Sequence, residues 1–102
     1  MNDEINYRAE DSSTYSLRIV DGTIKLDCYL IGSISGGFGT ECFHTIGNEN
    51  ISSFLGSLSC GSLGDLSIRL RNYQLEEWVA LHAIVLEFQT DSFTWTETNW
   101  DE

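Results

Sequence analysis

Proline is absent from this chain, and lysine and arginine are scarce. Its 102 residues include five Lys and Arg against 16 Asp and Glu, for a formal net charge of −11. Without proline, the edges of any sheet must be protected by charge and bulges. The five cations are scattered along the sequence and form no basic cluster, which argues against direct binding of nucleic acid or anionic membranes. They are Arg8, Arg18, Lys25, Arg69 and Arg71.

Cysteine and histidine are also few and widely spaced. Cys28, Cys42 and Cys60 are an odd set without a Cys-x-x-Cys pair, and His44 and His82 are the only histidines. This spacing excludes the usual zinc signatures and disfavours a disulfide framework. We therefore expect free, buried, reduced thiols, no metal site and no cofactor.

Long apolar runs are missing as well. No stretch approaches the roughly 20 apolar residues that span a bilayer. The N-terminus is acidic, where a secretory signal would be basic and then apolar. With 41% hydrophobic and 12% aromatic residues, residues 1–102 are expected to form one cytoplasmic domain, with flexible ends at 1–12 and 101–102.

The first half of the chain predicts strands. Asp21-Gly22 lies between two alternating runs, 15–20 and 24–30, which is typical of a two-residue β-hairpin. The glycine-rich stretch 32–39 predicts a loop, and residues 40–46 predict a third strand. A phosphate cradle is disfavoured there because no lysine follows the glycines and a strand follows the loop.

One amphipathic helix is predicted after these strands. Ile51, Phe54, Leu55 and Leu58 fall at i, i+3, i+4 and i+7, so they share one stripe. Either Asn48 or Asn50 would cap its start, and Gly61 would terminate it. Such a short helix needs a sheet against which to bury its stripe.

The rest of the chain is interpreted as three further strands. Residues 66–71 alternate in polarity, 78–88 are apolar on both faces, and 93–100 alternate aromatic residues with threonine. The last of these would suit a sheet edge. The order β-β-β-α-β-β-β predicts an α+β fold, in which a six-stranded antiparallel sheet or sandwich packs on one helix.

Catalytic groups are not concentrated anywhere in the sequence. Both histidines fall in predicted strands, where His82 is expected to be a core histidine and His44 lies beside Cys42. Glu76 and Glu77 are neighbours in a predicted turn, so their side chains point apart. We therefore expect a protein that is not an enzyme. A small ligand-binding or hydrolytic domain that uses the glycine loop and His44 is an alternative.

The last third of the chain carries acid and aromatic residues but no cations after Arg71. Such a mixture indicates a face that binds a basic partner, in which aromatic rings supply area and acids supply steering. A solvated acidic surface is the alternative, and Trp95 could instead be a core residue that shares its strand face with Phe93. The expected partner-binding residues are Glu76, Glu77, Glu87, Asp91, Trp95, Glu97, Trp100 and Asp101.

Two segments carry a resemblance to a known family. The run GFGTECF at 37–43, followed by NISSFLGSL at 50–58, resembles a pattern in small bacterial immunity proteins. There a glycine-rich β segment leads into a short helix, and a polar and a long apolar strand follow. The resemblance covers roughly residues 15–90.

These immunity proteins neutralise the toxins of contact-dependent growth inhibition and related polymorphic toxin systems. The resemblance implies a non-enzymatic antitoxin that covers or obstructs the active site of a basic toxin domain, with a nuclease as the expected class because many toxins of such systems are basic nucleases. We expect the protein to be a monomer. A nucleic-acid mimic that inhibits a DNA-binding defence protein is the alternative, and it requires carboxylates in a regular row at phosphate-like spacing.

Overall fold

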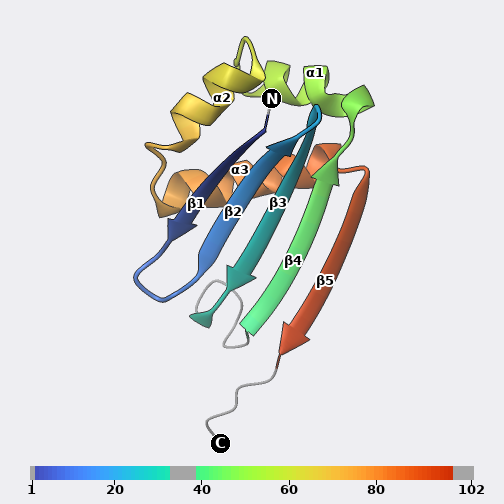
Figure 1. The fold of residues 1–102 in the computed structure, drawn as a ribbon. Coiled ribbons are helices and arrows are strands. Elements are labelled where there is room, and N and C mark those ends of the chain that lie inside the picture. The colour runs from blue at the N-terminus through green and yellow to red at the C-terminus, as the bar shows by residue number, and fades with distance from the viewer. Residues whose placement is uncertain (1, 33–38, 98–102) are drawn as a thin grey trace, which may run out of the picture.

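The computed structural model describes residues 2–32 and 39–97. Within them the chain is an α+β domain with one antiparallel five-stranded sheet and three helices (Figure 1). The strands are β1 (Asp3–Arg8), β2 (Thr14–Val20), β3 (Thr23–Leu30), β4 (Gly39–Ile46) and β5 (Asp91–Glu97), and the helices are α1 (Asn48–Ser57), α2 (Leu63–Leu70) and α3 (Leu75–Phe88). None of these helices has the length and apolar character required to cross a membrane.

The strands lie in the sheet in the order of the sequence, β1-β2-β3-β4-β5. The predicted hairpin is confirmed: Val20 pairs with Thr23, and Asp21 and Gly22 have φ angles of 52° and 80°. Both turn residues therefore adopt the left-handed conformation that a two-residue hairpin requires. The predicted third strand is β4. Of the predicted last strand, 93–100, residues 93–97 belong to β5 at the sheet edge, and 98–100 lie outside the described residues.

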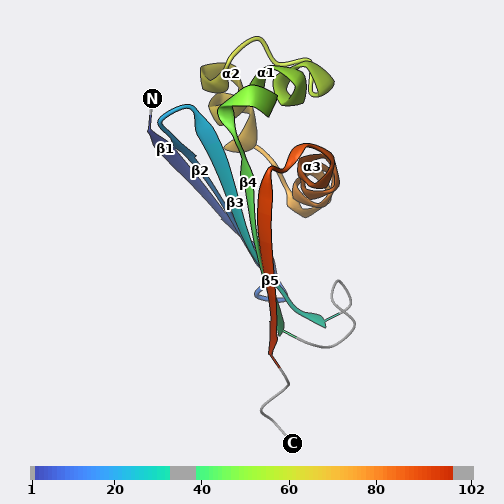
Figure 2. The ribbon, with the colours of Figure 1, turned by 90° about the vertical axis from the view of Figure 1, so that its right-hand side faces the viewer.

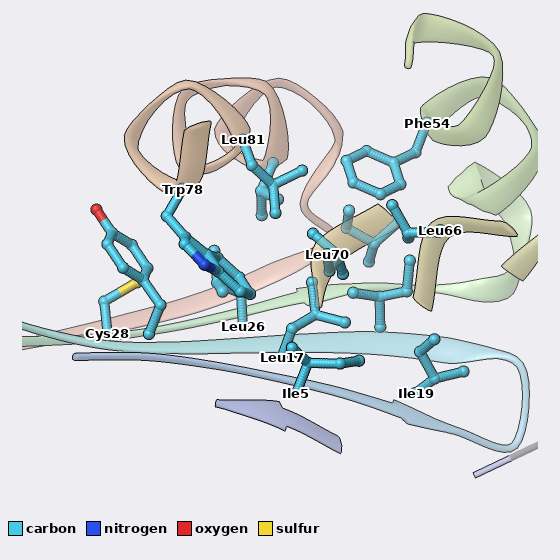
Figure 3. Close-up of a cluster of buried hydrophobic side chains, with 14 of the residues drawn as sticks. Ile5, Leu17, Ile19, Leu26, Cys28, Phe54, Leu66, Leu70, Trp78 and Leu81 are labelled. Atoms are coloured by element: carbon cyan, nitrogen blue, oxygen red, sulfur yellow. The ribbon is translucent and has the colours of Figure 1, made fainter. Parts of the chain in front are cut away.

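All three helices lie between β4 and β5 in the sequence and cover the same face of the sheet (Figure 2). Period-two alternation places one set of strand residues under the helices, where they are buried. The core includes Leu17, Ile19 and Leu26 from the sheet (Figure 3). Ile24 is buried with them. The opposite face of the sheet has no layer over it among the described residues.

Trp78 is the largest side chain of this core, and it closes one end of it. Its indole stacks on Tyr15, with ring centroids 5.5 Å apart, and lies edge-on to Tyr73 at 6.0 Å. Tyr7 of β1, which pairs with Tyr15, also stacks on the indole, with centroids 6.3 Å apart. These contacts anchor α3 across β1 and β2, and Figure 3 shows the indole pointing down onto the sheet.

Two of the predicted strands are helices. Residues 66–71 lie largely in α2, because Leu63, Leu66 and Leu70 form a helical stripe and the Ser62 hydroxyl accepts the Asp65 amide hydrogen at 3.1 Å. Residues 78–88 lie in α3, which buries Trp78, Leu81 and Val85 on its inner side. The prediction of six strands and one helix is therefore wrong in detail, although the α+β class is confirmed.

The predicted helix over 48–58 is confirmed as α1, but its ends differ from the prediction. The Asn50 side chain donates to the Phe88 carbonyl at 2.9 Å instead of capping the helix. At the other end Ser59, with φ 56°, takes the left-handed position expected for Gly61. The Cys60 amide donates back to the Leu55 carbonyl at 2.9 Å, which closes a Schellman motif.

The N-terminal segment, expected to be flexible, contains edge strand β1. An Arg71 guanidinium nitrogen lies 2.8 Å from the Asp3 carboxylate, and the Ser67 hydroxyl donates to the same group. These two hydrogen bonds lower the pKa of Asp3 below its usual range. Arg71, the C-cap residue of α2, thus offsets an acid of β1. Arg69 instead donates to the Leu58 carbonyl at 2.6 Å.

Candidate functional site

The uncovered face of the sheet is the most distinctive surface of the molecule. Polar residues occupy it over β1, β2 and β3, since these strands bury only the alternate set. Toward β4 and β5 its character changes to aromatic. Phe43, Phe93 and Trp95 lie on this face and are 36%, 59% and 49% exposed. We call these three residues the aromatic patch.

The register of the sheet assembles the aromatic patch from segments far apart in the sequence. Phe43 pairs directly with Phe93 across β4 and β5, and their rings stack with centroids 5.8 Å apart. Trp95 pairs with Glu41 one step along the same strands. A hollow beside the stacked rings is lined by Phe43, Thr45, Asp91, Ser92 and Phe93. Exposed rings around a hollow are the arrangement that protein interfaces use as anchors.

The charges of the uncovered face are separated along the sheet. Its cations, Arg8, Arg18 and Lys25, lie on β1, β2 and β3, and Arg18 contacts Asp27 at 3.2 Å. Among the residues whose side chains the structure describes, the acids beside the aromatic patch are Glu41 and Asp91, on β4 and β5. Neither of these strands contains a Lys or Arg. The patch is therefore flanked by negative charge, while the other half of the face is mixed.

The predicted partner-binding residues do not form one surface. Asp91 and Trp95 lie on the uncovered face, and Glu97 ends β5. Trp100 and Asp101 lie outside the described residues. Trp95, for which a core position was the alternative, is exposed.

The other three predicted residues, Glu76, Glu77 and Glu87, belong to α3 in the helix layer. Glu76 and Glu87 are about 16 Å apart along the helix axis at 1.5 Å per residue. Glu77 is not in a free turn, as predicted, because its carboxylate accepts the Gln74 backbone amide hydrogen at 2.6 Å and caps α3. Glu77 therefore stabilises the start of α3.

Phe43 was missed by the sequence analysis. It lies between Cys42 and His44, which both point into the core, so period two alone places it on the uncovered face. The available signal was that an apolar residue occupies an outward position of a strand. Its proximity to Phe93 could not be found in this way, because the pairing of β4 with β5 spans three intervening helices.

A buried chain of polar side chains links the helix layer to the sheet. His44 Nδ1 lies 2.6 Å from Gln89 Oε1, which only accepts, so this nitrogen carries the hydrogen. His44 Nε2 is then free to accept from His82 Nε2, 3.1 Å away. This leaves His82 Nδ1 to accept from the Cys28 thiol, whose sulfur is 4.0 Å distant. Every member therefore has a consistent role when both imidazoles are neutral.

Burial determines the protonation states of His82 and Cys28. Burial and the neighbouring His44 lower the pKa of His82 to about 4. Burial, reinforced by Cys42, raises the pKa of the Cys28 thiol far above its usual range. At neutral pH the His82 imidazole is therefore neutral and the Cys28 thiol is protonated. This pair presents no activated nucleophile.

This chain also corrects the expected placement of the histidines. His44 lies in a strand as predicted, but His82 lies on α3 and not in a strand. The His44 side chain bonds to Gln89 and His82. Within the described residues, no group of three potential metal ligands comes together. These hydrogen-bonded side chains fix α3 on β3 and β4, and they hold the segment that leads into β5.

Comparison with known proteins identifies no relative. No protein-family model, no curated protein and no solved structure matches this chain.

Proposed function

We propose that this chain is a non-enzymatic binding protein that docks on a basic protein domain through the aromatic patch. The observation that carries the proposal is the patch itself: three aromatic side chains exposed on a sheet face that has no covering layer, flanked by Glu41 and Asp91. Exposed aromatic clusters beside polar groups mark protein interfaces more often than chance placement does.

The partner class follows from charge. The net charge of −11 and the acids beside the patch favour a cationic surface and disfavour phosphate backbones. Together with the sequence resemblance, this supports an immunity protein that neutralises a basic toxin domain by covering or obstructing its active site. The resemblance favours a nuclease as that toxin. We place the protein in the cytoplasm, where it would act as a monomer.

The other hypotheses have less support. A nucleic-acid mimic needs a regular acidic row, whereas the uncovered face mixes Glu4, Asp27 and Glu41 with three cations. A ligand-binding domain needs a pocket around a perturbed histidine. The hollow beside the aromatic patch and two others near β1 are lined by other residues.

The proposal is tested with the toxic C-terminal domain of the protein encoded immediately upstream in the native host. Co-expression of the chain should restore growth, and the purified proteins should bind each other. The variant Phe93→Ser/Trp95→Ser should lose protection and weaken binding at least 100-fold, because it removes two central aromatic anchors.

The matched control is Val79→Ser/Leu86→Ser, which removes two apolar side chains that are 42% and 46% exposed on α3. It should bind within about threefold of the unmodified protein, since residues outside an interface change affinity little. Circular dichroism and thermal unfolding confirm that both variants are folded. If the control loses binding and the aromatic variant keeps it, the interface lies on the helix layer and the proposal is wrong.

A further inference from the structure

The two edges of the sheet are not equivalent. At one edge β1 is fastened to α2 through Asp3, which bonds to Ser67 and Arg71. At the other edge, among the described residues, β5 pairs only with β4 (Figure 1). The outward backbone groups of β5 are therefore available to a further strand.

β5 has only part of the usual protection of an edge strand, namely the acids at its two ends. Natural edges are blunted by charged side chains, especially lysine, by proline, by bulges or by short length. β5 contains no proline and no lysine, and it pairs with β4 over seven consecutive residues, from Asp91 to Glu97, without a bulge. Its regular geometry is suited to accepting another strand by main-chain hydrogen bonds.

The positions of the acids restrict which strand can bind. Asp91 begins β5 and Glu97 ends it, with no charged residue between them. In a two-fold antiparallel pairing of two copies that uses the whole strand, Asp91 of each copy is opposite Glu97 of the other. Like charges directly opposite one another oppose pairing. The same two acids favour a strand that carries a cation at each end.

We propose that β5 adds an extended segment of the basic partner to the sheet as a sixth, antiparallel strand. The segment carries Lys or Arg at two positions six residues apart, opposite Asp91 and Glu97, and apolar residues opposite Phe93 and Trp95. Its side chains on the uncovered face continue the aromatic patch, since directly opposite residues share a face. This inference rests on the proposed function and specifies how the partner is bound.

The first test uses peptides as the probe. A nine-residue peptide of alternating Thr and Val, with Lys at positions 2 and 8, should bind the folded protein in a fluorescence anisotropy titration. The same peptide with Glu at both positions should bind at least tenfold more weakly. The variant Asp91→Lys/Glu97→Lys should reverse this preference, because the charges opposite the peptide ends are reversed.

Methylated peptides separate strand addition from simple charge attraction. Two versions of the Lys peptide carry N-methyl groups on alternate amides, one version for each edge of the peptide strand. Because only one edge faces β5, at least one version should lose binding tenfold or more. Equal binding by both methylated peptides and the parent peptide would overturn strand addition.

Self-association gives an independent test that needs no partner. The unmodified protein should sediment as a monomer at 50 µM and low salt, because Asp91 of each copy would lie opposite Glu97 of the other. Asp91→Lys converts both opposed acid pairs into Lys–Glu pairs and should produce a dimer, with self-association strengthened at least tenfold. Asp91→Lys/Glu97→Lys is the matched control: it places Lys opposite Lys and should be monomeric. Monomers in all three proteins would overturn the availability of the β5 edge.

The results of these tests can be distinguished from the results that test the proposed function. If Phe93→Ser/Trp95→Ser abolishes binding of the toxin domain while the peptides and charge variants show no effect, docking on the face is upheld and strand addition is rejected. If the toxin domain does not bind at all but the Lys peptide does, the β5 edge is upheld and the identity of the partner is rejected.

Discussion

At the scale of single residues, the two histidines show how the hydrogen-bonding groups of polar side chains are satisfied next to the core. His44 and His82 are neighbours in space, yet each has a partner on its other side, Gln89 and Cys28. Neutral rings allow every hydrogen bond in the chain to run in one direction. A proton on His82 would turn its accepting nitrogen toward the thiol into a donor, so the Cys28 thiol could no longer donate to it and a positive charge would lie in a partly buried site.

We predict that stability falls as the pH drops from about 6.5 to about 4 because of His82. Its pKa is about 4 in the folded protein, against about 6.5 in the unfolded chain. Below pH 6.5 the unfolded state binds a proton that the folded state does not, which lowers the free energy of unfolding. The loss is at most about 1.4 kcal/mol per pH unit and levels off below the folded pKa.

Urea unfolding at half-unit pH steps measures this dependence. The variant His82→Gln retains a donor toward His44 but does not titrate, so its stability should change less over the same range. Acids contribute equally in both proteins, and the comparison isolates His82. Parallel pH profiles for the two proteins would show that the imidazole does not control this loss.

At the scale of helices and strands, the sequence predicted correctly those segments whose residue pattern fits only one structure. The Asp21-Gly22 turn requires left-handed backbone at both positions, so the hairpin was predicted correctly. The stripe that includes Phe54 gave α1 for the same reason. Both signals depend on residues close in sequence, and tertiary contacts do not override them.

The errors at this scale come from patterns that suit two structures. Residues 66–71 alternate in polarity, but Leu66 and Leu70 also fall on one helical stripe behind the Ser62 cap. α3 is apolar on both sides because its outer side exposes Val79 and Leu86, which made it resemble a buried strand. The predicted strand 78–88 was already longer than the usual strand length of about 4–8 residues, so length was the usable signal.

Glycine substitutions test the local geometry of these elements. We predict that Gly56→Ala stabilises the protein by about 0.5–1 kcal/mol, because Gly56 lies inside α1 and an added Cβ meets no atom within 4 Å. Gly22→Ala is the contrasting variant. Its φ of 80° is strained for alanine, and it should destabilise the fold by about 1 kcal/mol or more.

Chemical denaturation of the two variants and the unmodified protein gives both values. The midpoint should rise for Gly56→Ala and fall for Gly22→Ala, with unchanged m-values. A lower midpoint for Gly56→Ala would mean that position 56 of α1 is packed more tightly than the structure describes.

At the scale of the whole molecule, the acidic third of the sequence divides into two regions. Glu76 and Glu87 lie in the helix layer on α3, whereas Asp91 lies beside the aromatic patch together with Glu41, an acid from earlier in the chain. The sequence therefore predicted the kinds of residue at the candidate site but not its composition. Strand pairing decides which acids flank the aromatic rings, and that pairing is not a local property.

This division predicts which acids steer a basic partner. Glu41→Lys/Asp91→Lys and Glu76→Lys/Glu87→Lys each change the net charge from −11 to −7, since two acids become two cations. At 0.1 M salt the Debye length is about 10 Å, so charges near the patch act on the encounter more strongly than remote ones. Stopped-flow association with the toxin domain at 0.1 M salt should slow about tenfold or more for the first variant, and only about twofold to threefold for the second. The difference should shrink at 0.3 M salt. Equal slowing by the two variants would indicate that total charge, and not the acids beside the aromatic patch, governs association.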